Sequence, residues 1–579
     1  MTQNKDKNDN FLLQAGALAA AGFISRIIGL LYRSPLAAVI GDLGSGYFQA
    51  AYSIYTIVLL ISSYSIPSAV SKVIAQKLAL KEYRNAHRIF RCAVFYVLIT
   101  GTLAGLFLFF GAGLFVDGNA IPVLRVFAPT IFLYGLLGVL RGYFQAHKSM
   151  IQTSISQILE QIANALVSIG AAMLLIRLFA GTTKDGAMGA VFGEAVSKNP
   201  VFTGAAYGAV NAALVAVGET RKAMYGAMGS ALGTGAGVLT GLLFVWGVYC
   251  LNKGTFQRRI ERDHTPKTDS YSEISRMIIQ VVTPFILSTA AYNLSTSLNS
   301  TIYLKLYRSV KNLDEATVYA SYGVFSYKAV TIANIPVAFA SAMASAMLPS
   351  IAQLIACGKT GEARVKSAMA VKSTMLLSIP CAAGLFFLAR PVTALLFPQK
   401  ETLDLAASLL RALSVTVIFF ALSTLSSSIL QGIGKINTPI YHAVAALAVQ
   451  TIVLIVLLLG TESNLYALVI ANIVYSGLMC VLNQLAVRKA IGYRQEIRTT
   501  FLIPLGASLV MGLVAFGIYT GLYALVHSNM IALCVAIPVA AGIYFLLLLF
   551  LKGITQAELL ALPKGYLLVK AAKKCRLLR

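Results

Sequence analysis

The sequence predicts an all-α polytopic membrane protein with about 14 transmembrane helices, arranged as two pseudo-symmetric six-helix lobes plus two C-terminal helices. The first observation behind this prediction is composition. Of the 579 residues, 58% are hydrophobic and only 12% are charged, which lies outside the range of soluble globular domains. The second is the recurrence of apolar runs of about twenty residues, the length that crosses a bilayer as a helix. The third is a sequence echo between the two halves of the chain.

Apolar runs divide the chain into successive predicted spans. Their approximate limits are residues 11–40, 46–70, 92–116, 122–146, 153–178, 224–250, 276–304, 316–346, 366–392, 405–430, 437–461, 464–487, 499–524 and 529–551. The polar amino terminus has no cleavable small-residue site close behind the first apolar run. We therefore expect that run to be an uncleaved span rather than a signal peptide.

The charge distribution predicts the orientation of these spans. With the amino terminus inside, inner loops and tails hold 31 of the 47 Lys and Arg residues, outer loops and span ends hold 12, and four (Arg26, Arg33, Lys328 and Lys372) lie within spans. The positive-inside rule then predicts that both termini are cytoplasmic. The net charge of +26 thus reflects topology, and no nucleic-acid partner is expected. The basic tail, residues 564–579, is expected to anchor the topology or to contact anionic lipid headgroups.

One connection departs from the pattern of short outer loops. Residues 180–225 are rich in Gly and Ala and carry several charges, so they look like an insertion. Their apolar patch, residues 201–217, is short and made mainly of small side chains. It predicts an outer-face re-entrant or loosely ordered segment rather than a further span.

Two pairs of segments indicate an internal repeat. Residues 66–71 are echoed 282 positions later by residues 348–353, and residues 142–148 are echoed at an offset of 290 by residues 432–437. Six spans per repeat is an even number, so both halves enter the membrane from the same side. A parallel repeat of this kind predicts a substrate site between the lobes. The expected domains are an N-lobe (1–250), a C-lobe (251–490), and a final part (491–579) with two spans and the basic tail.

The first span carries two arginines inside an apolar run. Arg26 and Arg33 are seven residues apart, so on a helix they lie on nearly the same face, about 10 Å from each other. An arginine at bilayer depth is costly when it faces lipid and tolerated when it faces a wet cavity. A guanidinium pairs bidentately with phosphate or carboxylate, so an anionic guest is expected. For Arg33, snorkelling to the interface remains an alternative.

Three further charged residues lie within the predicted spans. Lys328 is twelve residues into its span and is expected to be a third cavity cation, with snorkelling as the alternative, whereas Lys372 is expected to snorkel. Glu160 is the one clear carboxylate. It could bind a proton or Na⁺, counter an arginine, or sit at a packing seam with Gln157 and Gln161. Three cations against one carboxylate favour an anionic guest such as a diphosphate.

The remaining motifs exclude several classes of function. Seven cysteines form no CxxC pair and no Cys/His metal spacing. No Ser/His/Asp set, Gly-rich phosphate loop or nucleotide motif stands out. We therefore expect no metal, no cofactor and no enzymatic activity, although transport could be coupled to H⁺, Na⁺ or the membrane potential.

Several segments together resemble the polysaccharide-biosynthesis branch of the MOP flippase superfamily, in particular MurJ-like lipid II flippases and the SpoVB group. The segments that carry this resemblance are residues 25–33, 46–55, 66–72, 141–145 and 156–161. The resemblance runs over most of the chain and is densest in the first 165 residues. It implies fourteen helices in two six-helix lobes, alternating access, and essential cavity arginines at Arg26 and Arg33. Lys328 falls near a position where relatives often carry arginine, and the 180–225 insertion departs from the family pattern.

The function expected from these observations is export of an undecaprenyl-diphosphate-linked oligosaccharide, such as lipid II or a related cell-wall precursor. Arg26, Arg33 and Lys328 would bind the diphosphate, and Glu160 could serve in ion coupling. The expected protein is a monomer in a bacterial plasma membrane. A cation-coupled multidrug exporter of the same superfamily is the alternative, and a membrane glycan polymerase or transferase is a third. The exporter would need acidic cavity residues, and the enzyme would need an outer domain or paired carboxylates.

Overall fold

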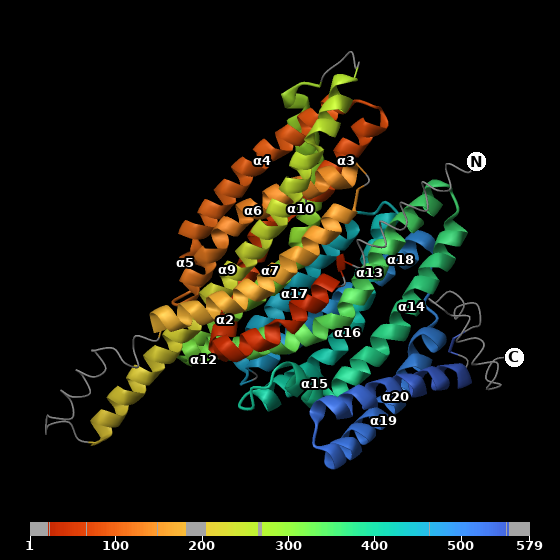
Figure 1. The fold of residues 1–579 in the computed structure, drawn as a ribbon. Coiled ribbons are helices and arrows are strands. Elements are labelled where there is room, and N and C mark those ends of the chain that lie inside the picture. Colours follow the sequence, from red (N-terminus) through yellow and green to blue (C-terminus); the bar gives the residue numbers. More distant parts are fainter. Residues whose placement is uncertain are drawn as a thin grey trace. The chain divides into compact units, whose positions relative to one another are not determined.

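A computed structural model describes residues 21–22, 24–64, 66–147, 149–180, 204–263, 269–462, 464–551 and 553–554. Within this described part the regular structure is helical, with no strand. The chain forms two compact units, one ending at Gly323 and the other beginning at Val324. Figure 1 shows the helices of each unit as ribbons.

The first unit begins with a short helix, Ile24–Leu31, that meets α2 at a bend of 44°. Its other elements, with π-helical segments labelled η, are α2 (Arg33–Leu59), η1 (Leu60–Tyr64), α3 (Ile66–Ala79), α4 (Tyr83–Phe110), α5 (Ala112–Phe115), α6 (Ala120–Ala146), α7 (Ile151–Leu175), η2 (Ile176–Ala180), α9 (Gly204–Glu261), α10 (Tyr271–Ile302), η4 (Tyr303–Tyr307), α11 (Arg308–Lys311) and α12 (Glu315–Gly323).

The second unit is also a helical bundle. Its elements are η5 (Val324–Val330), α13 (Thr331–Ala356), α14 (Thr360–Phe387), α15 (Ala389–Leu396), α16 (Leu403–Gly432), α17 (Thr438–Gly460), α18 (Leu465–Ile491), η6 (Arg498–Leu502), α19 (Ile503–Val526) and α20 (Asn529–Phe550). Helices α13, α14 and α18 pack around α16. The last two helices are attached through α14, because the Tyr544 hydroxyl of α20 donates to the Leu376 carbonyl at 2.8 Å.

The helices confirm a multi-pass membrane protein. Among the described residues, eleven helices are long and apolar enough to cross a membrane, or up to twelve when the bent pair Ile24–Leu31 and Arg33–Ser62 counts as one span. The exact number of fourteen spans and the two six-helix lobes stay predictions. The break expected between the first two spans, at residues 41–45, coincides with a kink inside α2. Two helical stretches meet there at Gly41 (φ 69°, ψ −178°), and glycine is suited to the position because it tolerates positive φ.

The 180–225 insertion differs from its predicted form. Residues 181–203 lie outside the described residues, but from Gly204 the chain is continuously helical to Glu261. A re-entrant or loosely ordered segment is therefore wrong for residues 204–217, which extend the helix of the predicted span 224–250. At about 1.5 Å per residue, α9 is roughly 87 Å long, several times the thickness of the hydrocarbon layer. Small side chains such as Ala favour helix, and this propensity carries the helix beyond the span.

Helices α7 and α9 run side by side in Figure 1 and pack through a stripe of small residues. Every fourth residue of α9 over one face is a glycine, and each approaches the backbone of α7. The pairs are Gly229 with Ala172, Gly233 with Ser168, Gly237 with Glu160 and Asn164, and Gly241 with Ser156. Small residues spaced by four let membrane helices approach closely, since lipid supplies no hydrophobic force between them.

Helices α3 and α13 end in the same kind of hydrogen-bonded turn. After α3, the Glu82 N–H donates to the Lys77 carbonyl at 3.0 Å, and Lys81 has a positive φ of 63°. After α13, the Lys359 N–H donates to the Leu354 carbonyl at 2.9 Å, and Gly358 has a φ of 71°. The same six-residue turn also ends α16, where the Lys435 N–H donates to the Leu430 carbonyl at 2.9 Å. It is a common way of ending a helix, and the internal repeat stays a prediction.

The glycine stripe predicts that adding one methyl group to α9 destabilises the fold at some positions and not at others. A Cβ at Gly237 would lie 2.5 Å from the Glu160 carbonyl oxygen, whereas a Cβ at Gly247 of the same helix meets nothing within 4 Å. We expect Gly237→Ala to lower the free energy of unfolding by about 1–3 kcal/mol through overpacking. Gly247→Ala should be neutral or slightly stabilising, because alanine favours helix. Thermal unfolding of the two purified variants measures the difference, and equal melting temperatures would contradict the packing described here.

Candidate functional site

The two arginines of the first span lie on either side of the bend. Arg26 belongs to the helix Ile24–Leu31 and is exposed, and Arg33 is the first residue of α2 and is half-buried. The bend falls at Tyr32, where hydrogen bonds from Tyr32 N–H to the Ile28 carbonyl (3.2 Å) and from Leu36 N–H to the Tyr32 carbonyl (3.1 Å) keep the two helices nearly continuous. The arginines therefore keep the helical spacing that the sequence predicts.

The faces of this helix differ in what they contact. Ile24, Ile27 and Leu31 share one face, and between 41% and 58% of each is exposed. The face that contacts α7 carries Tyr32, whose hydroxyl accepts from Asn164 Nδ2 at 3.3 Å. At about 100° per residue, Arg26 and Arg33 lie roughly 140° from the centre of the exposed apolar face. The arginines thus do not share the face best suited to lipid.

Glu160, on α7, pairs with an arginine that the sequence analysis did not single out. Arg141 of α6 donates from Nη2 to Glu160 Oε2 at 2.8 Å and from Nε to Ser156 Oγ at 2.8 Å. The side chains are only 8% and 14% exposed. Of the three roles considered for Glu160, the structure contains the counter-ion to an arginine, and ion coupling stays a prediction.

A signal for this pair is present in the sequence. Arg141 lies five residues before the end of the predicted span 122–146, and Glu160 lies seven residues after the start of the next span, 153–178. Two antiparallel helices joined by a short loop place such positions at similar depth. Because a buried charge needs a partner, opposite charges at equal depth in consecutive spans are the pattern that reveals the pair.

Lys328 is placed in the second unit. It lies in η5 and is 1% exposed, and its Nζ donates to Thr402 Oγ1 at 2.8 Å. Arg26 and Arg33 belong to the first unit, so a pocket formed by all three cations stays a prediction. The π-helical geometry is notable because such segments are rare and are frequent at functional sites.

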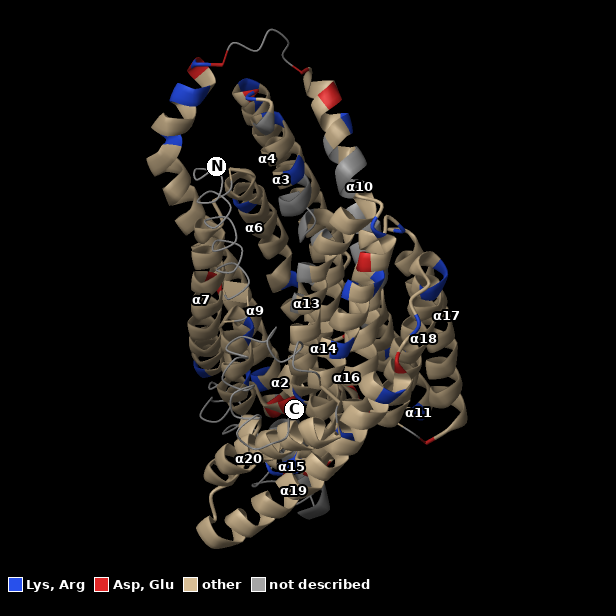
Figure 2. Ribbon diagram, turned by 90° about the vertical axis from the view of Figure 1, so that its right-hand side faces the viewer, with Lys and Arg blue, Asp and Glu red and all other residues tan. Residues whose placement is uncertain are grey.

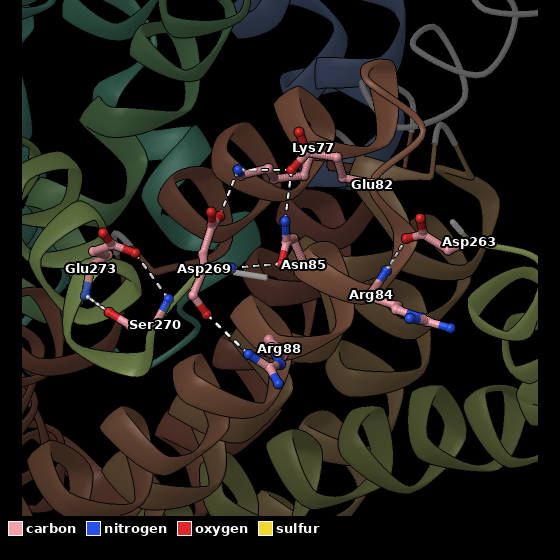
Figure 3. Close-up of polar contacts among 9 residues, drawn as sticks. All are labelled: Lys77, Glu82, Arg84, Asn85, Arg88, Asp263, Asp269, Ser270 and Glu273. Atoms are coloured by element: carbon pink, nitrogen blue, oxygen red, sulfur yellow. Dashed lines mark hydrogen bonds and ion pairs between the residues drawn. The ribbon is translucent and has the colours of Figure 1, made fainter. Parts of the chain in front are cut away.

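A second polar cluster lies where α9 ends and α10 begins. Figure 2 shows basic and acidic residues at these helix ends, while most of the helix length is free of charge. Figure 3 shows the contacts in detail. Lys77 Nζ lies 2.9 Å from Glu82 Oε2 and 2.6 Å from Asp269 Oδ2. The Asp269 N–H donates to Asn85 Oδ1 at 3.0 Å. We call Lys77, Glu82, Asn85 and Asp269 the turn network.

The turn network joins two connections of the first unit. Arg84 and Arg88 reinforce it, because the Arg84 N–H donates to Asp263 Oδ2 at 2.7 Å and Arg88 Nη1 donates to the Asp269 carbonyl at 3.1 Å. Helix α10 then starts with a capping box, in which Ser270 and Glu273 satisfy each other's backbone N–H groups. These bonds hold the start of α10 against the α3–α4 turn.

The turn network shifts the pKa values of its charged members. Partial burial alone would lower the pKa of Lys77, but the hydrogen bonds to Asp269 and Glu82 outweigh it and the pKa lies above its usual value. Hydrogen bonds from Asn85 and Lys77 hold the pKa of Glu82 below its usual value. Both shifts mean that the charged forms are favoured in the folded protein.

The described residues contain no group of three or more His, Cys, Asp or Glu side chains that could hold a metal ion. Long apolar helices with a few internal charges, two of them paired and buried, define a multi-pass membrane protein. Charges buried among such helices are typical of transporters.

Comparison with known proteins identifies the family. A family model described as "Lipid II flippase MurJ" matches residues 117–533, and one described as "Polysaccharide biosynthesis protein" matches residues 12–196. Because the first match covers more than half of the chain, the protein belongs to the MurJ family of the MOP superfamily. It is therefore a flippase-type transporter and not an enzyme.

Individual relatives agree with this assignment. The Lipid II flippase MurJ of Bacillus subtilis (strain 168) is 23% identical over 520 residues, 86% of each chain. Stage V sporulation protein B of the same organism is 30% identical over 168 residues, 28% of this chain and 32% of that protein. Among solved structures, "Lipid II flippase MurJ, inward closed conformation" has a TM-score of 0.61 at 14% identity, covering 92% of this chain and 97% of that chain. A MATE-family multidrug transporter of the MOP superfamily has a TM-score of 0.56, also at 14% identity, over 80% of this chain and 95% of that chain. These structural likenesses show the fold.

The buried pair of Arg141 and Glu160 predicts that removing one charge destabilises the protein more than removing both. Glu160→Gln leaves the Arg141 charge buried without its carboxylate, which should lower the free energy of unfolding by about 3–5 kcal/mol. The double variant Arg141→Gln/Glu160→Gln removes both charges and should recover much of that loss. Thermal unfolding checks stability, and transport by the double variant separates the two roles. Restored transport means that Glu160 serves Arg141, whereas a stable but inactive double variant means that the ionisable pair is needed for transport.

The turn network predicts that the stability of the fold depends on pH. The stability that the Glu82 carboxylate adds to the folded protein is present above its unfolded pKa of about 4.3. It is lost as pH falls through the lowered pKa of the folded state. The stability that the Lys77 ammonium adds is present below its unfolded pKa of about 10.4. It is lost as pH rises through the raised pKa of the folded state. We expect Glu82→Gln to lower the melting temperature at pH 7, with a gap from the native protein that narrows below about pH 4.

A matched control for this measurement lies in the turn between α13 and α14. Glu362 is 2.9 Å from Lys359, but both side chains are more than half exposed. Exposed pairs contribute little, so Glu362→Gln should leave the melting temperature nearly unchanged. If Glu82→Gln also unfolds like the native protein at pH 7, the turn network does not stabilise the fold.

Proposed function

We propose that this protein exports an undecaprenyl-diphosphate-linked oligosaccharide, lipid II or a related precursor, across a bacterial plasma membrane by alternating access. The observation that carries the proposal is the pair Arg26 and Arg33 in an apolar span, set away from its exposed apolar face. In a member of the MurJ family, two guanidiniums at this depth suit a lipid-linked diphosphate. Each group can hold phosphate oxygens bidentately, and charge-assisted bonds of this kind are strong.

The proposal assigns roles to the other charged residues of the spans. Lys328 would approach the diphosphate as a point charge, which requires it to leave Thr402 during transport. Glu160 would join ion coupling only if its pair with Arg141 opens during the cycle. Coupling to H⁺, Na⁺ or the membrane potential fits this arrangement. The orientation has both termini in the cytoplasm, since the basic loops, including the residues around the turn network, then lie inside.

A cation-coupled multidrug exporter of the same superfamily is the alternative. Such a protein needs acidic residues to receive a cationic guest, and the one clear carboxylate within the predicted spans is neutralised by Arg141. The electrostatic argument therefore favours an anionic substrate.

The first-span arginines predict loss of transport when either is removed. In proteoliposomes, Arg26→Ala and Arg33→Ala should each slow the transbilayer movement of a labelled lipid-linked glycan about 10- to 100-fold, which corresponds to a charged hydrogen bond of about 1.5–3 kcal/mol. Arg26→Lys should retain part of the activity, because lysine keeps the charge but loses the bidentate geometry.

The control is Lys372→Ala, which removes a cation from another span that is expected to snorkel. It should transport at the native rate. The proposal fails if Arg26→Ala and Arg33→Ala, reconstituted at native levels, move the lipid as fast as the control. Uptake of a cationic dye in the same vesicles, with no lipid movement, would instead support the multidrug exporter.

A further inference from the structure

A pocket of about 470 Å³ lies at the end of the first unit where α5 leads into α6. Its lining residues are Asp117, Lys305, Arg308, Ser309, Asn312 and Leu313. Helix α10 starts at the turn network and runs 32 residues to Ile302, directly before η4. The pocket and the turn network therefore lie at opposite ends of this helix. Neither the first-span arginines nor Glu160 lines this pocket.

Helical periodicity gathers one wall of the pocket. Lys305, Arg308, Ser309 and Asn312 follow the spacing i, i+3, i+4 and i+7, which places them on one face of the η4–α11 helix. This helix ends at Asn312, whose φ of 49° is left-handed, a conformation that asparagine tolerates better than most residues. The face thus presents an ammonium, a guanidinium, a hydroxyl and an amide to the same space.

The opposite wall is held in place by α12. The Asn119 N–H donates to Glu315 Oε1 at 3.0 Å, and the Asp117 N–H donates to the Tyr319 hydroxyl at 3.3 Å. Between them, Gly118 has a φ of 53° and lies against the Glu315 carboxylate, so a side chain at this position would be blocked. These bonds fix the turn that carries Asp117, and the pocket is formed without a ligand.

The two cations of the pocket keep donors available. Lys305 Nζ donates to the Leu114 carbonyl at 2.9 Å but lies 3.9 Å from Asp117 Oδ1. Arg308 Nη1 lies 3.7 Å from Glu315 Oε2. Both ion pairs are longer than a hydrogen bond, and each cation's side chain is 39% exposed. An anion entering the pocket could therefore bind both without breaking a short ion pair.

We propose that this pocket binds a sugar that carries a carboxylate or phosphate group. Lys305 and Arg308 receive the anionic group, which a guanidinium can bind bidentately. Asp117, Ser309 and Asn312 pair with sugar hydroxyls, since a carboxylate accepts from them and hydroxyl and amide groups both donate and accept. Leu313 offers the apolar contact that suits one face of a sugar ring. The pocket is open to solvent and its lining is mainly polar, which suits a hydrophilic ligand.

This site goes beyond the proposed function and does not depend on it. The same chemistry could be supplied by a free acidic sugar or by the glycan of a translocated lipid. The pocket lies at the end of the unit opposite the basic turns. In the orientation proposed above, it faces the outside, where an exported glycan emerges.

The test is binding of defined probes to the full-length purified protein. Calorimetric titration compares glucuronate and glucose 6-phosphate with uncharged glucose. We expect both acidic sugars to bind at least tenfold more tightly than glucose and to weaken as salt is raised. Lys305→Gln/Arg308→Gln should lose at least tenfold in affinity for glucuronate. Lys311→Gln, which removes a cation from the same helix without touching the pocket lining, should bind as the native protein does.

A further variant separates a binding role from a structural one. Asp117→Asn removes the one negative charge of the lining but keeps an oxygen that accepts from a sugar hydroxyl. It should therefore raise the affinity for glucuronate, whereas damage to the pocket would lower it. Equal binding of glucose and glucuronate, or native affinity in Lys305→Gln/Arg308→Gln, would overturn the proposal.

The source of the ligand follows from transport in proteoliposomes. If Lys305→Gln/Arg308→Gln loses probe binding and also slows movement of an acidic lipid-linked glycan, the site serves the translocated glycan. If it loses probe binding at an unchanged transport rate, the site takes a free acidic sugar. Both outcomes support the site, and neither bears on the outcome for Arg26→Ala.

Discussion

Hydrocarbon cannot solvate a charge, and this constraint organises the described structure. Each charged group within an apolar helix must be paired, reach an interface or face water. Arg141 meets the requirement through Glu160 and Ser156. Lys328 is buried with its ammonium on the Thr402 hydroxyl. Arg26 and Arg33 are set apart from the exposed apolar face of their own helix, and contact with a hydrated path is what we propose for them.

The glycine stripe connects that constraint to the rest of the first unit. Because α9 offers no side chains at the contact, α7 approaches it closely along Ser156, Glu160, Asn164 and Ser168. The same stripe of α7 supplies the carboxylate for Arg141 and, through Asn164, a hydrogen bond to Tyr32 at the bend of the first span. One packing seam thus positions both the buried pair and the helix that carries the arginines. A methyl group in the seam is expected to disturb both.

The features that could be predicted from the sequence are those encoded by the periodicity or the composition of a segment. Hydropathy predicted a multi-pass helical membrane protein, and the motifs of the first 165 residues indicated the correct family. Features that depend on contacts between residues far apart in the sequence could not be predicted. The partner of Glu160 and the bonds from Asp269 to the α3–α4 turn are such contacts. The helical extension of α9 depends on local propensity that hydropathy does not register.

The central claim is that the first-span arginines line a hydrated path rather than a lipid contact. Cysteine accessibility in membranes tests it directly, in a variant without native cysteines, using a membrane-impermeant thiol reagent. Arg26→Cys and Arg33→Cys should be labelled, because a hydrated path admits the reagent, whereas Ile27→Cys and Leu31→Cys on the exposed apolar face should not. Labelling at positions 27 and 31 with none at 26 and 33 would contradict the account.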